Sequence, residues 1–270
     1  MPIRARSRLL TGSRESAADL RRGGPHTRTA VLAAAALVPV LALTAACGGG
    51  GGGGGGDDKA KKEPGPVRAS GAVSTAKLTS ALLTSSDVPH VQVLPAGSKT
   101  QLLGPATTVD NAACQPVADQ WSSRPKHTRQ VYTGAMVTDT ADKDKNAKAI
   151  SLEVIASYAP GTAETVLDEL TTALKTCRGF KATRDGGVTS YTVRPVAPPA
   201  GRPALGDQEV AYTIADTARG AAGVVLVTVV RSGGATAAYE TVRADHKTAT
   251  LRAAIALKQA EKLRAAATGD

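Results

Sequence analysis

Stretches of apolar and β-branched residues, each of strand length, recur along the chain from residue 90 onwards. They predict strands over residues 90–94, 130–138, 149–158, 180–184, 188–196, 209–215, 224–231 and 235–242. Turn-forming segments separate several neighbouring strands, at residues 139–146, 185–187, 219–220 and 232–234. Strands joined by such short turns form hairpins, so this part of the sequence predicts an antiparallel sheet.

Apolar residues at helical spacing occupy four other segments. The expected apolar faces are Leu78, Leu82 and Leu83 after a cap at Ser74 or Thr75; Cys114, Val117 and Trp121 after a cap at Asp110; Val166, Leu167, Leu170, Leu174 and Cys177 within 163–177; and Leu251, Ile255 and Leu263 within 245–266. Hairpins outnumber possible βαβ crossovers. The sequence therefore predicts an α+β fold, an antiparallel sheet with helices packed on one face.

An uncharged apolar run covers residues 30–46. Seven arginines but only Glu15 and Asp19 precede it, so half of the chain's net charge of +10 lies in this leader. A basic region followed by a short apolar run is typical of a signal peptide, whereas a membrane-spanning helix needs about 20 apolar residues. We expect residues 1–46 to be a cleaved signal peptide, with an uncleaved anchor as an alternative. The remaining positive charge suits an anionic membrane surface.

The apolar run ends in Leu43-Thr44-Ala45-Ala46-Cys47, which resembles a bacterial lipobox. The resemblance implies cleavage between Ala46 and Cys47 and attachment of a diacylglyceryl group, with acyl chains such as palmitate, to the Cys47 thiol. Such a lipoprotein is held on the extracytoplasmic face of the cell membrane. Two alternatives are an ordinary secretory signal with an incidental cysteine, and twin-arginine export through Arg21-Arg22.

Residues 48–56 are all glycine, and a polar segment rich in lysine and proline follows them. Such a segment cannot bury a core, so we expect residues 47–72 to be a lipidated cysteine and a disordered linker with a root-mean-square reach of roughly 25–30 Å. Residues 73–266 then suit one extracellular domain, and residues 267–270 form a short tail.

Two cysteines remain beyond Cys47, namely Cys114 and Cys177. An even pair in an exported domain indicates a disulfide, which closes a long loop and stabilises the fold by roughly 4 kcal/mol in the chain-entropy treatment. Two buried free thiols and a metal site are the alternatives. The histidines beyond residue 47 are scattered along the sequence, and none pairs with a cysteine at ligand spacing, which disfavours the metal.

Aromatic residues make up 3% of the chain, so no stacking surface for nucleic acid is expected. Ser74 and Ser123 each begin an S-x-x-K match, but the companion motifs of the penicillin-binding proteins are missing. Residues 142–153 partly follow an EF-hand pattern, yet Ala147 stands where that loop needs glycine, so a solvated hairpin turn is the favoured interpretation.

Acidic residues that could meet in space, although the sequence cannot show it, are Glu153, Glu164, Asp168, Glu169, Glu209 and Glu240. No nucleophile and base stand at a spacing that favours catalysis. We therefore assign no catalytic residue, no metal ligand and no cofactor.

Several short motifs together resemble a known family. They are 78–83 (LTSALL) with Asp87-Val88-Pro89, Cys114, residues 170–177 with Gly179-Phe180, Leu205-Gly206-Asp207, and residues 227–231. Over about residues 76–263 the chain resembles actinobacterial sensor-domain lipoproteins related to the extracellular domain of the PknH-type serine/threonine kinases. The resemblance implies an α+β sheet, a groove for an extracytoplasmic ligand, and no catalysis. Kinase-type sensor domains usually have two disulfides, whereas this chain can form one. It also has no kinase domain, so a signal would pass to another protein.

These observations predict a non-catalytic, membrane-anchored domain that binds an extracytoplasmic ligand or an envelope protein, and no nucleic acid. A groove is expected on the sheet face that the helices leave uncovered. A carrier of lipid or another hydrophobic ligand is the first alternative, and would show a large apolar cavity. An envelope enzyme is the second, and would show titratable groups clustered in a cleft.

Overall fold

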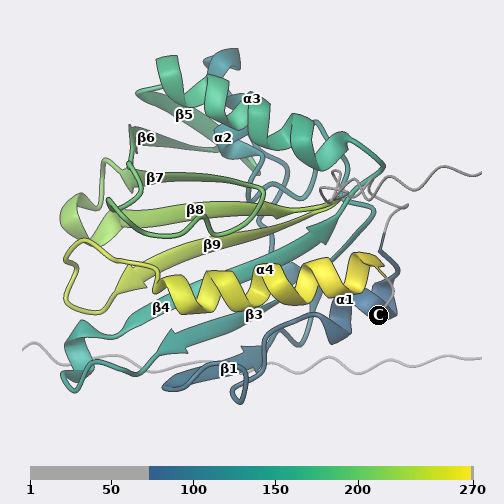
Figure 1. The fold of residues 1–270 in the computed structure, drawn as a ribbon. Coiled ribbons are helices and arrows are strands. Elements are labelled where there is room, and N and C mark those ends of the chain that lie inside the picture. Colours follow the sequence, from purple (N-terminus) through teal and green to yellow (C-terminus); the bar gives the residue numbers. More distant parts are fainter. Residues whose placement is uncertain (1–72, 269–270) are drawn as a thin grey trace, which may run out of the picture. The chain divides into compact units, whose positions relative to one another are not determined.

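The structure is a computed structural model that describes residues 73–268. Within this range nine strands form one antiparallel sheet in the order β1-β3-β4-β9-β8-β7-β6-β5-β2 (Figure 1). The strands are β1 (Val91–Pro95), β2 (Thr108–Val109), β3 (Val131–Asp139), β4 (Ala149–Ser157), β5 (Gly179–Arg184), β6 (Gly187–Pro195), β7 (Gln208–Asp216), β8 (Val224–Ser232) and β9 (Ala235–Arg243). The antiparallel sheet predicted from the hairpin signals is confirmed. Only the two-residue strand β2 was not anticipated.

Four α-helices lie in the described part of the chain: α1 (Thr75–Ser80), α2 (Gln115–Ala118), α3 (Thr162–Thr176) and α4 (Ala253–Thr268). Short 3-10 turns occur at η1 (Lys99–Gln101), η2 (Ala112–Cys114), η3 (Lys145–Ala147) and η4 (Gly220–Gly223). No helix within residues 73–268 has the length and apolarity that a membrane crossing requires. The α+β class predicted from the sequence is confirmed.

The helices divide between the two faces of the sheet, which corrects the expectation that they all pack on one. Helices α1 and α4 cover a core that includes Ile155 and Val230, while α2 and α3 cover a second core that includes Ala156 and Val229. These residues are neighbours in β4 and β8, so their side chains point to opposite faces. Strand β8 is apolar at consecutive positions, and such a strand needs cover on both sides. In Figure 1, α4 lies in front of the sheet and α3 lies near the end of the sheet where β5 and β6 are labelled.

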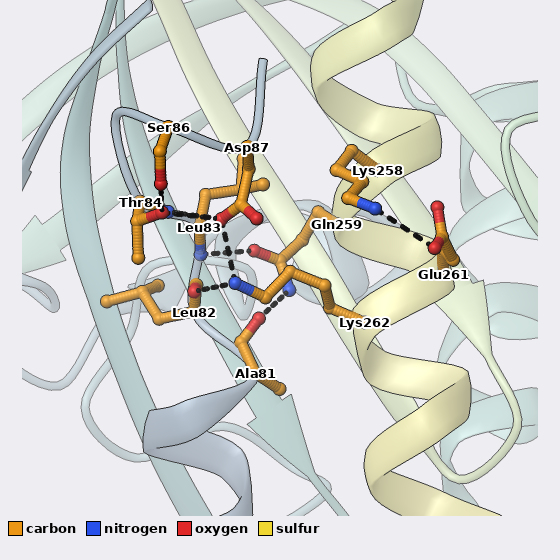
Figure 2. Close-up of polar contacts among 10 residues, drawn as sticks. All are labelled: Ala81, Leu82, Leu83, Thr84, Ser86, Asp87, Lys258, Gln259, Glu261 and Lys262. Carbon is orange, nitrogen blue, oxygen red and sulfur yellow. Dashed lines mark hydrogen bonds and ion pairs between the residues drawn. The ribbon is translucent and has the colours of Figure 1, made fainter.

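A buried amide fixes α4 to the segment that follows α1 (Figure 2). The Gln259 side chain donates to the Ala81 carbonyl at 2.8 Å and accepts from the Leu83 amide at 3.0 Å. One turn further on, Lys262 donates to the Asp87 carboxylate at 2.7 Å. Buried polar groups are retained only where they find partners, so these bonds align the last helix with the first.

A disulfide links Cys114, in η2, to Cys177 at the end of α3, with an S–S distance of 2.11 Å. Both residues are fully buried in the core beneath α2 and α3. The predicted bridge between two helical segments is therefore present, and it joins elements that are 63 residues apart in the sequence.

Two predicted helix starts are wrong. Asp110 does not cap the second helix, because its carboxylate accepts from the Lys181 amide at 2.8 Å and so ties β2 to β5; Asn111 caps η2 instead. The last helix begins at Ala253 and not at Asp245, because the Asp245 carboxylate pairs with Arg243 in the turn after β9. In both places an acidic residue of capping type is used by a nearer tertiary partner.

Candidate functional site

A groove of about 360 Å³ opens on the sheet face that carries α2 and α3. Its floor is formed by side chains from four adjacent strands, and its walls come from η1 with the segment that follows it and from the β5–β6 hairpin. The lining residues are Thr100, Gln101, Leu102, Leu103, Gly104, Trp121, Leu152, Arg184, Tyr191, Ile214, Val225 and Glu240. The groove is therefore mostly apolar, with one carboxylate and one guanidinium.

The strand register explains why the floor residues share a face. Leu152 of β4 stands directly opposite Glu240 of β9, and Val225 of β8 stands opposite Ile214 of β7. Residues directly opposite in an antiparallel pair point to the same side of the sheet. The alternate residues of β9 point the other way, which places Tyr239 in the core beneath α4.

One wall of the groove depends on a glycine. Leu102 and Leu103 are buried against Val154, so the segment after η1 packs directly on the sheet. A Cβ atom at Gly134 would clash with the Glu153 carbonyl oxygen on β4 and would come within 2.8 Å of the Leu102 side chain. Glycine at this position of β3 therefore permits the close approach of both the neighbouring strand and the segment that forms this wall.

Glu240 is the acidic group of the groove. It is partly buried, and no described residue forms a hydrogen bond or an ion pair with its carboxylate. Burial raises the pKa of this carboxyl, and the positive charge of Arg184 lowers it in part. The groove thus contains a poorly hydrated carboxylate without a hydrogen-bonded partner of its own.

Arg184 is the basic group, and its position is fixed by three neighbours. Its Nε donates to the Thr107 hydroxyl at 3.0 Å, and its guanidinium carbon lies 5.9 Å from the ring centroid of Trp121 and 5.8 Å from that of Tyr191. A guanidinium held over aromatic faces keeps its charge and its planar set of donors. Because only Nε is used within the described residues, the two terminal nitrogens remain available to a ligand.

Glu153 lies on the opposite face of the sheet, away from the groove. Its side chain is 0% exposed, and neither carboxylate oxygen has a hydrogen-bond partner among the described residues. Burial raises the pKa of Glu153 to about 7. The rise is opposed by the hydroxyl of Tyr239, which stands directly opposite Glu153 on β9, and by the charge of Lys262. The Tyr239 hydroxyl is near enough to act electrostatically, but its geometry does not make a hydrogen bond.

The other acidic residues singled out in the sequence are dispersed. Asp168 accepts from Gln208 at 2.9 Å, and Glu209 pairs with Arg202. Glu169 pairs with Lys126 at 2.6 Å and with His127 at 3.0 Å, and these bonds lower the pKa of its carboxyl, Lys126 contributing most. Glu164 is exposed on α3. Glu164, Asp168 and Glu169 share α3, but Asp168 and Glu169 are bound by different partners, and within residues 73–268 no group of His, Cys, Asp or Glu side chains is arranged as metal ligands would be.

The predicted lipidation and cleavage residues, Ala46 and Cys47, lie outside the described part of the chain, as does the predicted linker. Trp121 was expected on the apolar face of the second helix. Helix α2 ends at Ala118, so the indole falls beyond it and lines the groove instead. Nothing in the sequence around Arg184 marks it as a site residue. Only its neighbourhood in space gives it a role, because Trp121 and Glu240 are both distant from it in the sequence.

Comparison with known proteins gives structural likenesses only. No protein-family model and no curated protein matches this sequence. The extracellular domain of PknH from Mycobacterium tuberculosis is similar in structure, with a TM-score of 0.47 and 12% identity over 74% of this chain and 98% of that one. An uncharacterised protein from Mycobacterium smegmatis, a Rv0999 ortholog, has a TM-score of 0.30 and 20% identity over 73% of this chain and 96% of its own. The first of these is the type of domain that the sequence motifs resemble.

Proposed function

We propose that this chain is an exported lipoprotein whose domain binds a ligand or partner outside the membrane, without catalysis. The observation that carries the binding role is the groove, in which Glu240 and Arg184 face an apolar floor and are not ion-paired with each other. Ligand sites are typically concave and mostly apolar, with a few well-placed polar groups. The membrane anchor rests on the lipobox that ends at Cys47.

The position of the groove supports recognition by a rigid surface. Its floor belongs to central strands of the sheet, and the Cys114–Cys177 disulfide fastens the helical layer beside it. A site built on regular elements keeps its geometry better than a site on loops, which lowers the cost of binding. A tether that confines such a domain to the membrane surface raises its effective concentration near neighbouring envelope components.

A carrier of hydrophobic ligands remains the second candidate, and one observation favours it. The apolar floor of the groove is continuous with exposed side chains that lead toward the β1 edge of the sheet, including Met136 of β3. A carrier, however, shields its whole ligand in an enclosed apolar cavity, whereas this groove is open to solvent and contains two charged groups. These features support reversible recognition over transport.

The binding role can be tested with the chain's single tryptophan, because Trp121 lines the groove. Envelope extracts should change the emission of the full chain, and Leu152→Arg, which places a charge on the floor, should abolish the change. A matched control is Val188→Arg, since Val188 is 63% exposed on the other face of β6. Turnover of an envelope substrate that a single substitution abolishes would replace this proposal with an enzyme.

A further inference from the structure

A row of side chains extends from the groove to the edge of the sheet. Glu240 of β9 stands opposite Leu152 of β4, Leu152 opposite Met136 of β3, and Met136 opposite Leu94 of β1. Strands in a sheet are about 4.8 Å apart, so the three steps from Glu240 to Leu94 span about 14 Å. The row is charged at one end and aliphatic along the rest of its length.

The aliphatic part of this row is open to solvent. Leu94 is 69% exposed and Met136 is 48% exposed, and Val242, two residues beyond Glu240 on the same face, is 38% exposed. Leu102 and Leu103, in the segment after η1, pack beside this row against Leu152. Exposed apolar side chains that form a continuous strip mark a surface that an apolar group covers.

The charged end calls for a ligand with charges of both signs. The partly buried Glu240 carboxylate forms no hydrogen bond or ion pair with a described residue, and the charge of Arg184 offsets its burial only in part, so a cation brought by a ligand would restore the interactions that burial removes. The terminal nitrogens of Arg184 are free to bind a phosphate or carboxylate. A purely anionic head group would be repelled by Glu240, and a purely cationic one by Arg184.

We propose that the groove binds a zwitterionic amphiphile, with its ammonium at Glu240, its phosphate or carboxylate at Arg184, and its acyl chain along Leu152, Met136 and Leu94. This inference rests on the proposed function, because it names the ligand class of the same groove. The commitment to an amphiphile follows from the order of the groups: the two charges lie at one end, and a single unbroken aliphatic strip leads away from them.

The test uses the full chain with Cys47→Ala, so that no anchor acyl chain competes for the groove. Lauroyl-lysophosphatidylethanolamine, kept below its micelle concentration, should change the Trp121 emission saturably. Lauroyl-lysophosphatidylglycerol lacks the ammonium and should bind about tenfold more weakly, since it cannot make the charge-assisted contact with the Glu240 carboxylate. Dodecylamine lacks the phosphate and should be weaker by a similar factor.

Three substitutions assign the contacts. Glu240→Gln should remove most of the preference for the ethanolamine over the glycerol head group, and Arg184→Gln should weaken both. Met136→Lys should weaken every acylated probe by about tenfold, because it places a charge in the path of the chain. Val188→Lys, on the exposed opposite face of β6, should bind as the unmodified chain does.

Several results would overturn the inference. Equal affinity for the two lysolipids would show that Glu240 does not recognise an ammonium, and unchanged binding in Met136→Lys would place the acyl chain elsewhere. If the unmodified chain is a dimer and Met136→Lys is a monomer, the strip is covered by a second copy. If envelope extracts change the emission but the lysolipid does not, the binding role stands and the ligand class is wrong. If neither changes it, both proposals fail.

Discussion

Replacing Glu153 by Gln should remove a pH-dependent loss of stability from this domain. Glu153 is fully buried on the sheet face that carries α1 and α4, and its carboxylate oxygens have no hydrogen-bond partner among the described residues. Burial raises the pKa of the folded protein's carboxyl from 4.5 to about 7, although Tyr239 and Lys262 act in the opposite direction. The buried amide of Gln cannot titrate, so it has a constant effect over this range.

The sign and size of the effect follow from proton linkage. The folded protein holds the Glu153 proton more tightly than the unfolded chain, so the contribution of Glu153 to stability is fully present below pH 4.5 and is lost as the pH rises through 7. A difference of 2.5 pKa units corresponds to about 3 kcal/mol, at 1.36 kcal/mol per unit. The free energy of unfolding of the unmodified protein, relative to that of Glu153→Gln, should therefore fall by about 3 kcal/mol between pH 4 and pH 8.

Urea unfolding followed by Trp121 emission measures this difference at each pH. Other shifted carboxyls, such as those of Asp87 and Asp245, are common to both proteins and cancel in the comparison. Glu164→Gln removes a carboxylate from the exposed side of α3 and controls for the change in net charge. Parallel stability profiles for the unmodified protein and Glu153→Gln would refute the reasoning, because they would mean that Glu153 titrates alike in the folded and unfolded states.

Three further predictions concern the anchor and the fold. Cys47→Ala should release the protein from detergent-extractable membrane, as fractionation can show; unchanged retention and mobility would contradict the lipid anchor. Replacing both Cys114 and Cys177 by Ala should lower the free energy of unfolding by about 4 kcal/mol, because the bridge links residues that are 63 positions apart in the sequence. A decrease of less than about 1 kcal/mol in urea unfolding would contradict this prediction. Gln259→Ala should lower the free energy of unfolding by about 2–4 kcal/mol in the same assay, because the Ala81 carbonyl and the Leu83 amide lose their buried partner. The control Lys258→Ala, on the outer side of α4, should lower it by under about 1 kcal/mol.

Strand pairing was predictable from the sequence because the signals are local. The Asp185-Gly186-Gly187 turn sets the β5–β6 hairpin, with Asp185 and Gly186 at positive φ, and Ser74 caps α1 as expected. The distribution of helices between two faces was not predicted. It depends on which side of a doubly apolar strand such as β8 each helix meets, and that choice is made by tertiary packing.

The groove was beyond the reach of sequence patterns for a related reason. In the sequence, Glu240 is one of several scattered acidic residues, and Trp121 stands at a position that predicts a helix face. Arg184 lines the same groove as these two residues because the β5–β6 hairpin forms one of its walls and β9 forms part of its floor. A site assembled from strands and loops far apart in the sequence has no fixed residue spacing, so no motif could reveal it.

Hydrogen exchange on the full chain, with and without envelope extract, tests the central claim most directly. The claim is that a ligand occupies the groove between the segment after η1 and the β5–β6 edge. The account predicts new protection of the backbone amides of residues 99–104 and 184–191, and loss of that protection in Leu152→Arg. Protection confined to other segments, or none at all, would contradict a binding role for the groove.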